Sequence, residues 1–301
     1  MSFATDSKEL VSILDVIRYG ISQACSAQLY YGHGTDNAVD DIYALVFETL
    51  HLPWDMDKQF LQSRLTEAEK KLLIERLEQR VTHHVPVPYL TNKAYFCGMS
   101  FYVDERVLIP RSPIAELIRQ QFSPWIDADQ VLRIMDMCTG SGCIAIACCE
   151  AFPEAMVDAV DVSEDALVVA AINCERHHVT EQLTLIQSDG FDQVPSQLYD
   201  IIVSNPPYVS HDAMQTLPAE YHHEPKLALE ADDAGLAFVR RMLEQASRYL
   251  TENGILVIEV GLSEEALIAA YPEVPFVWLE FEHGGEGVFM LTAQNLRDIR
   301  V

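Results

Sequence analysis

Apolar residues recur at helical spacing through the first part of the chain. Between residues 8 and 30 they fall three or four positions apart, which predicts an amphipathic helix. The polar residues 35–37 offer a cap for a second helix over about residues 38–50. A capping box at residues 66–69 predicts a third helix that runs to about His83. We expect these helices to form a small domain of their own.

The pattern changes at a proline-rich joint that begins at Pro86. Aromatic runs on both sides of Gly98 are typical of strands and predict a short hairpin. Ser112 can cap a helix and Pro113 fits its first turn, so a helix is expected from there to about Phe122.

From residue 130 onward, short apolar strands alternate with helices. That alternation is typical of a parallel sheet, so the predicted fold class is α/β. The predicted strands cover residues 131–136, 156–161, 183–187, 201–204, 255–260, 276–281 and 288–291. The predicted helices cover Cys143–Ala151, a segment capped by Ser163, and about Leu236–Leu250.

A glycine turn follows the first of these strands. Asp136 ends the strand, and Gly140-Ser141-Gly142 opens the next helix. The glycines allow a tight turn and let backbone amides approach a ligand at the helix start. A dinucleotide fingerprint needs Gly-x-Gly-x-x-Gly or a final alanine, and Ala145 fills that last position, so a dinucleotide site stays open here.

Polar side chains also end the next three strands. Asp161 can accept both hydroxyls of a ribose. Asp189, or the backbone beside it, can meet the edge of an adenine, and Asn205 ends the strand after that. Ligands of open α/β sheets bind just beyond the carboxyl ends of the strands. With Asp136, these residues predict an adenosyl ligand and a substrate along one sheet edge.

The stretch Asn205-Pro206-Pro207-Tyr208 directly follows a β-branched run. The two prolines remove two backbone donors and fix two φ angles, which makes the turn stiff and extended. An amide side chain, free prolyl carbonyls and a flat tyrosine ring suit a planar –NH2 group held edge-on. A rigid loop without a function is the simpler alternative.

The charge of the chain narrows the choice of partner. Its 20 lysines and arginines face 46 aspartates and glutamates, a formal net charge of −26. This opposes nonspecific binding to nucleic acid and favours a basic partner, although acidity that serves solubility alone would look the same. A hydrophobic content of 49% is typical of a globular protein. We expect neither a transmembrane helix nor a signal peptide.

The seven cysteines lack the spacing of a disulfide framework, which indicates reduced thiols and a cytoplasmic protein. Cys143, Cys148 and Cys149 fall in an apolar helical stretch, where free cysteine behaves as a small hydrophobic residue. We therefore expect no metal site.

The turn at 136–142 together with Asn205–Tyr208 resembles the class I S-adenosylmethionine-dependent methyltransferases. That resemblance implies S-adenosyl-L-methionine as cofactor and a Rossmann-like, seven-stranded sheet with an antiparallel final hairpin. Further motifs look like the protein-glutamine methyltransferases, which methylate the side-chain amide nitrogen, N(5), of a glutamine in release factors or in large ribosomal subunit protein three. These motifs are Pro110–Pro113 with Glu116, and His223–Leu229. Those that look like the ribosomal branch are Tyr31–Asn37, Thr91–Phe96 and Gly284–Leu291.

The resemblance also implies roles for individual residues. The implied cofactor-binding residues are Asp136, Cys138, Thr139, Gly140, Ser141, Gly142, Asp161, Asp189 and Asn205. The implied substrate-binding residues are Asn205, Pro206, Pro207, Tyr208 and Arg111, of which Asn205, Pro206 and Tyr208 would be catalytic. By this hypothesis the Asn205 side-chain oxygen and the Pro206 carbonyl accept the two N–H bonds of the glutamine amide, and Tyr208 packs on the amide plane.

Some residues depart from the family pattern or have no assigned role. Gly190 stands where a bulkier apolar residue is usual, and Cys138 stands where many relatives of the other branch carry glycine. Arg111 can face the cleft or lie on the surface. His33 can contact a partner, although a loop histidine is more often exposed and inert.

These observations divide the chain into three parts: a helical substrate-recognition domain at 1–85, a joint with hairpin and bridging helix at 86–125, and a cofactor-binding catalytic domain at 126–301. The expected partner is a basic ribosomal protein, without stable nucleic-acid binding and without a membrane. Three alternatives stay open. They are the release-factor branch, a nucleic-acid adenine methyltransferase, and a Rossmann-like binding module without catalysis.

Overall fold

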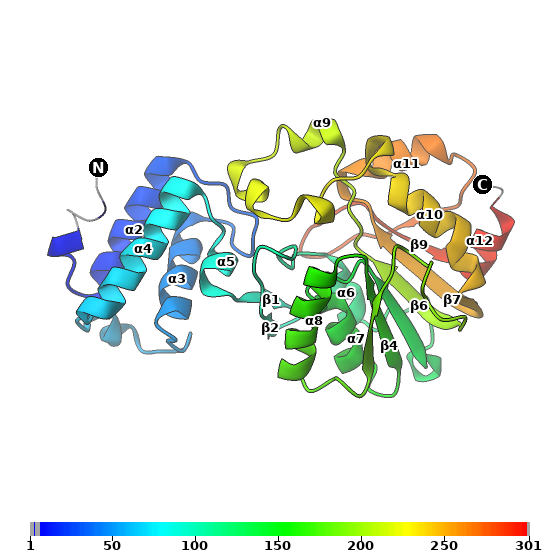
Figure 1. Cartoon of the computed structure of the whole chain (residues 1–301), viewed down its shortest axis with the longest axis horizontal. Coiled ribbons are helices and arrows are strands. Elements are labelled where there is room, and N and C mark those ends of the chain that lie inside the picture. The colour runs from blue at the N-terminus through cyan, green and yellow to red at the C-terminus, as the bar shows by residue number, and fades with distance from the viewer. Residues whose placement is uncertain (1–2, 4–6, 300–301) are drawn as a thin grey trace. The chain divides into compact units, whose positions relative to one another are not determined.

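The computed structural model describes residue 3 and residues 7–299, and the chain divides into two compact units (Figure 1). The first, the helical unit, contains Met1–Ala94 together with Pro218–His223. The second, the sheet unit, contains Tyr95–Leu217 and Glu224–Val301. The helical unit is therefore built from two stretches that are far apart in the sequence.

The helices of the helical unit each have an apolar face, and three of them begin at a polar capping residue. Ser12 and Thr66 each form a capping box, and the Asn37 side chain accepts two backbone N–H groups at the start of its helix. The predicted caps at Asn37 and Thr66 are confirmed, but the first helix starts later than predicted because Ser12 caps it. The helices are α2 (Ile13–Ala27), α3 (Ala38–Thr49), α4 (Glu67–His83) and α5 (Val87–Thr91). The last of these lies in the proline-rich joint, where no helix was predicted.

The middle stretch contains the predicted hairpin, formed by β1 (Ala94–Phe96) and β2 (Met99–Phe101). Helix α6 (Ile114–Arg119) starts where it was predicted, but Pro113 and not Ser112 occupies its cap position. Ser112 Oγ still accepts the N–H of Ile114 at 3.2 Å. The helix ends short of Phe122 because the backbone there is left-handed, with a φ of 54°.

A seven-stranded sheet organises the sheet unit, in the order β5-β4-β3-β6-β7-β9-β8. The first five strands of that order pair in parallel, and β9 runs antiparallel to both of its neighbours. The predicted α/β fold, with a Rossmann-like seven-stranded sheet and an antiparallel final hairpin, is confirmed. The strands are β3 (Arg133–Met137), β4 (Met156–Asp161), β5 (Leu183–Gln187), β6 (Tyr199–Ser204), β7 (Leu250–Glu259), β8 (Val277–Trp278) and β9 (Val288–Thr292).

Two layers of helices cover the sheet, so its central strands are buried on both faces (Figure 1). Alternate side chains of one strand face opposite layers: Ile134 belongs to the apolar cluster that contains residues of α6, α7 and α8, whereas Met135 belongs to the cluster that contains residues of α10, α11 and α12. Burial on both faces explains why the strands read as continuous apolar runs. The helices are α7 (Cys143–Ala151), α8 (Glu164–Arg176), α9 (His211–Met214), α10 (Ala237–Gln245), α11 (Glu264–Ala270) and α12 (Ala293–Asp298).

The last part of the chain departs most from the prediction. Strand β8 covers two residues instead of 276–281, and Pro275 lies two residues before it. Strand β7 starts at Leu250, inside the predicted helix 236–250, because Leu250 already pairs with Tyr199 before an irregularity in the ladder. Helices α9, α11 and α12 were not predicted.

Short 3-10 helices join the main elements at Ser7–Glu9, Lys58–Gln62, Ala128–Gln130, Ala219–His223, Lys226–Ala228, Asp233–Gly235, Ala246–Arg248 and Gly261–Ser263. Across residues 3 and 7–299, none of the helices combines the length and the apolar character that crossing a membrane requires.

The core of the helical unit gives a first prediction. Leu77 is fully buried on α4, whereas Leu72 on the same helix is 39% exposed. We expect Leu77→Ala to lower the free energy of unfolding by about 2–5 kcal/mol, because it removes buried surface and leaves a cavity. Leu72→Ala is the matched control and should cost less than about 1 kcal/mol. Urea unfolding measures both variants, and equal losses would contradict this description of the core.

Candidate active site

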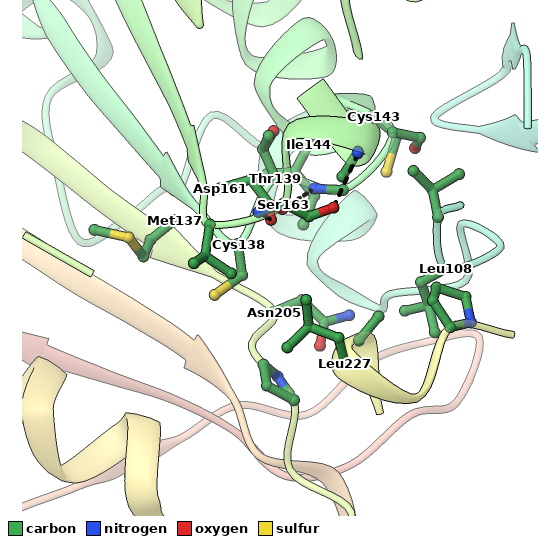
Figure 2. Close-up of a pocket in the computed structure, with 18 of the residues that line it drawn as sticks. Leu108, Met137, Cys138, Thr139, Cys143, Ile144, Asp161, Ser163, Asn205 and Leu227 are labelled. Atoms are coloured by element: carbon green, nitrogen blue, oxygen red, sulfur yellow. Dashed lines mark hydrogen bonds between the residues drawn. The ribbon is translucent and has the colours of Figure 1, made fainter. Parts of the chain in front are cut away.

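The carboxyl ends of β3, β4, β5 and β6 meet at one edge of the sheet. The register sets Met137 beside Val160 and Ser204, and Asp161 beside Gln187, so the following loops begin side by side. A cavity lies there (Figure 2). Residues 102–113, which join β2 to α6, are called the bridge below. The cavity walls include Cys138, Thr139, Gly140, Ser141, Asp161, Asp189, Asn205 and Pro207 from the sheet edge, Leu108 and Arg111 from the bridge, and Pro225, Leu227, Ala228 and Phe238 from later segments.

The Asp136 carboxylate holds the glycine turn through hydrogen bonds. This carboxylate is fully buried, and Oδ2 accepts the Thr139 hydroxyl at 2.6 Å and the Ala145 backbone N–H at 3.1 Å. Burial raises the pKa of this carboxyl to about 7, although the hydrogen bonds from Thr139 and Ala145 lower the pKa. Asp136 is not among the residues that line the cavity. Its role in this structure is to hold the turn, not to form the cavity wall.

The turn itself is left-handed at several positions. Cys138 has a φ of 63°, a conformation that glycine adopts more readily than cysteine, which agrees with the glycine expected there in related sequences. A Cβ built on Gly140 would have no neighbouring atom within 4 Å. Asn173 supports the turn from α8, donating to the Ser141 carbonyl at 2.9 Å. The turn therefore leaves open space at the cavity wall, where a ligand can approach the backbone closely.

Asp161 ties the turn to the next strand. Its Oδ2 accepts the Gly140 N–H at 2.9 Å, and its Oδ1 accepts the Ser163 N–H at 2.9 Å (Figure 2). Burial raises the pKa of the Asp161 carboxyl, while these backbone donors act in the opposite direction. Each carboxylate oxygen can accept more than one hydrogen bond, so Asp161 keeps the capacity to accept hydroxyl groups from a ligand in the cavity.

Asp189 lies at the rim and is exposed. Its carboxylate accepts Arg241 Nη1 at 2.6 Å, and its carbonyl accepts Nη2 at 3.0 Å. Gly190 has a φ of 59°, and a Cβ there would lie 3.0 Å from the Arg241 guanidinium. Both the left-handed backbone and the arginine explain why glycine replaces the bulkier residue expected at this position.

Asn205 presents its side chain to the cavity at the end of β6 (Figure 2). Within the described chain no hydrogen bond occupies that amide. Pro207 lines the cavity as well, whereas Pro206 is buried and Tyr208 is not part of the cavity wall. Asn205 is thus the polar group of this tetrapeptide that the structure places at the cavity.

Tyr208 holds the tetrapeptide in place. Its hydroxyl donates to Glu259 Oε1 at 2.8 Å, and a Cβ on Gly261 would lie 2.6 Å from its ring. The second oxygen of Glu259 accepts the Ser112 hydroxyl at 2.5 Å. Burial raises the pKa of Glu259, and its two hydroxyl partners act against that rise. Glu259 therefore connects the tetrapeptide to the bridge before α6.

Arg111 faces the cavity and is paired. Its two terminal nitrogens lie 2.6 Å and 2.8 Å from the two carboxylate oxygens of Glu224, a bidentate arrangement. The Glu224 side chain is fully buried and also accepts the Ile109 N–H at 2.9 Å. This pair joins the bridge to the segment that carries Pro225 and Leu227, so two walls of the cavity share one buried carboxylate.

His33 lies in the helical unit, where it is buried and packs on Tyr221 with ring centroids 4.7 Å apart. The expectation of an exposed loop histidine is wrong, because Tyr221 comes from the distant second stretch of this unit. The sequence interpretation also gave no role to Glu259, Phe238 or Arg241. Glu259 could have been found, since it is an acid at the end of an apolar strand, as Asp161 is. No local signal marks the other two.

Comparison with known proteins places this site in a family context. Residues 121–222 match the model of the methyltransferase small domain. The ribosomal protein uL3 glutamine methyltransferase of Francisella tularensis subsp. tularensis is 48% identical over 288 residues, covering 95% of this chain and 92% of that protein. The enzyme of the same name from Xanthomonas campestris pv. campestris is 46% identical over 293 residues, covering 97% and 95%. A methyltransferase structure from Pyrococcus furiosus aligns with a TM-score of 0.48 and 16% identity, over 76% of this chain and 99% of that one.

Asp136 gives a prediction about pH. Its pKa rises from 3.8 to about 7 on folding, so the stability it contributes is complete below about pH 4 and is lost as the pH rises through about 7. Between pH 5 and pH 8 the unmodified protein should lose about 2 kcal/mol more free energy of unfolding than Asp136→Asn, which has no carboxyl to titrate. Urea unfolding at both pH values measures the difference. The same pH dependence in both proteins would refute the assignment.

Proposed function

The chain belongs to the family of ribosomal protein uL3 glutamine methyltransferases, and from this membership we propose that it methylates the side-chain amide nitrogen, N(5), of a glutamine in uL3. S-adenosylmethionine is the proposed methyl donor. The observation that carries the proposal is the position of Asn205, an amide without a protein partner in the described chain, at the cavity that the glycine turn and Asp161 also line.

The residues of the cavity fit an adenosyl cofactor. The open space beside Gly140 leaves room for a ligand against the backbone, and Asp161 retains acceptor capacity for ribose hydroxyls. Phe238 and Leu227 offer apolar surface for a flat ring. We propose that Cys138–Gly142, Asp161 and Asp189 surround the cofactor, with Asp136 acting through the turn.

S-adenosylmethionine supplies an electrophilic methyl group on a positively charged sulfur. The glutamine nitrogen is a weak nucleophile because its lone pair is delocalised, so the protein must position it. We propose that Asn205 Oδ1 and the Pro206 carbonyl accept its two N–H bonds and hold it in line with the methyl group. The same oxygens would stabilise the positive charge that develops on nitrogen as the bond between the methyl carbon and sulfur breaks. That charge is lost when one of the two N–H protons leaves to solvent. The packing of the Tyr208 ring on the amide plane is part of this proposal.

The remaining assignments rest on the proposed substrate. A net charge of −26 is complementary to a basic ribosomal protein and opposes a phosphate backbone. We propose that residues 1–85 recognise the substrate, that 86–125 bridge the two functions, and that 126–301 bind the cofactor and catalyse the transfer. Because the proposed substrate belongs to the ribosome, we propose that the reaction takes place in the cytoplasm.

Mass spectrometry of unmodified uL3, incubated with this protein and S-adenosylmethionine, tests the function. We expect one added methyl group on one glutamine. Methylation of a release factor instead would keep the chemistry but change the substrate. No methylation of either protein, with strongly salt-dependent DNA binding, would favour adenine as the target.

Substitution of Asn205 tests the mechanism. Asn205→Ala should lower kcat by roughly 100-fold to 1,000-fold, because one acceptor for the reacting amide is lost. Asn205→Asp keeps an acceptor oxygen of similar size and should retain more activity than the alanine variant. Calorimetry with S-adenosylmethionine checks that both variants still bind cofactor. Near-normal turnover by folded Asn205→Ala would rule out the mechanism.

A further inference from the structure

A short stretch of the chain connects the helical unit to the cavity wall through the backbone. Residues Pro218–His223 belong to the helical unit, and the residues on both sides of them belong to the sheet unit. Glu224 follows directly and binds Arg111, and Pro225, Leu227 and Ala228 then line the cavity. Because the peptide bond holds adjacent Cα atoms about 3.8 Å apart, a displacement of His223 that is larger than local rotation can absorb also displaces Glu224.

A buried guanidinium holds this stretch. Arg80 is 2% exposed, and its Nε donates to Asp41 Oδ2 at 2.7 Å. Its Nη1 donates to Glu220 Oε1 at 3.1 Å, and its Nη2 donates to the Tyr30 carbonyl at 2.9 Å. Glu220 is also 2% exposed and accepts the Tyr30 N–H at 3.0 Å, while His84 Nδ1 lies 3.1 Å from the same oxygen. The guanidinium is thus satisfied by one carboxylate from each stretch of the helical unit.

Two residues that follow Glu220 add further contacts to this attachment. The Tyr221 ring lies 4.7 Å from the His33 ring and 5.5 Å from the Tyr30 ring, measured between centroids. His223 Nε2 lies 2.7 Å from the His83 carbonyl. Three residues of the six-residue stretch therefore have specific partners in the first stretch of the unit.

We propose that Arg80 and Glu220 are positioning residues for the active site, which fix residues 218–223 and thereby the cavity wall at 224–228. This inference rests on the proposed function. By the same proposal, the segment Tyr31–Asn37 helps to hold residues 218–223. His33 packs on Tyr221, and the Thr35 hydroxyl donates at 2.9 Å to the Asp41 carboxylate that binds Arg80.

The chain offers a matched control for this proposal. Asp41 is 5% exposed and binds the same guanidinium, but it lies on α3 and not on residues 218–223. Glu220→Gln and Asp41→Asn each neutralise one buried partner of Arg80 and should destabilise the helical unit to a similar extent. Only Glu220→Gln changes a side chain of the stretch that leads to the cavity.

Trypsin provides a readout that does not depend on activity. Lys226 lies on the cavity-wall segment, and its side chain is 68% exposed. Cleavage after Lys226, followed by mass spectrometry of the intact full-length protein, should be at least about fivefold faster in Glu220→Gln than in the unmodified protein. Asp41→Asn should stay within about twofold of the unmodified rate.

Binding and kinetics complete the test. Glu220→Gln should bind S-adenosylmethionine at least about threefold more weakly by calorimetry and should lower kcat/KM for uL3, relative to Asp41→Asn. Tyr221→Leu, which removes ring contacts without leaving a buried charge unpaired, should act in the same direction and serves if Glu220→Gln does not fold.

Equal cleavage rates and equal cofactor affinities for Glu220→Gln, Tyr221→Leu and Asp41→Asn would overturn the inference. This outcome is separate from a failure of the proposed function. If the unmodified protein does not methylate uL3, the function fails, whereas cleavage after Lys226 and cofactor affinity still decide whether Arg80 and Glu220 fix the cavity wall.

Discussion

Burial of the central strands on both faces is the constraint on which the rest of the site depends. Strands β3, β4 and β6 lie between two layers of helices, so most residues within them are apolar. A polar group within such a strand needs a buried partner, as Asp158 has in Tyr199, whereas a group at a strand end can also reach loop backbone and the cavity. Asp161 and Asn205 stand at two such ends, and the parallel pairing aligns those ends at one edge. The cavity is a consequence of this arrangement, because the loops diverge there toward opposite layers.

The buried carboxylates of this site hold the backbone more than they face a ligand. Asp136 binds the glycine turn, Glu224 binds the bridge through Arg111, and Glu259 joins the bridge to the tetrapeptide. A buried carboxylate needs several donors to offset its lost hydration. The donors to Glu259 come from two different loops, and those to Glu224 come from a segment far from it in the sequence, so these two carboxylates fix the relative position of distant segments. Asp136 instead holds the turn and the helix start that directly follow it. The proposed catalytic group, Asn205, lies at the end of a strand whose following loop is held by Glu259.

Local signals in the sequence were enough for the fold and for the residues at the strand ends. The capping box at Thr66, the turn at Gly140 and the strand end at Asp161 each depend on neighbours within a few positions, so their pattern could be read directly. Contacts between distant segments could not be read in this way. Glu224 pairs with a residue 113 positions away, and Glu259 with one 147 positions away. The burial of His33 was not predicted for the same reason, because its ring partner Tyr221 lies far along the chain.

The discontinuous build of the helical unit limits how this protein can change by recombination. An exchange that replaced only residues 1–94 with those of a relative without an arginine at position 80 would leave Glu220 without this partner. A carboxylate that is 2% exposed cannot turn to water for compensation. Residues 218–223 must therefore be inherited together with the N-terminal stretch, although the coding sequence for most of the sheet lies between them. Two distant stretches of the gene form one heritable module.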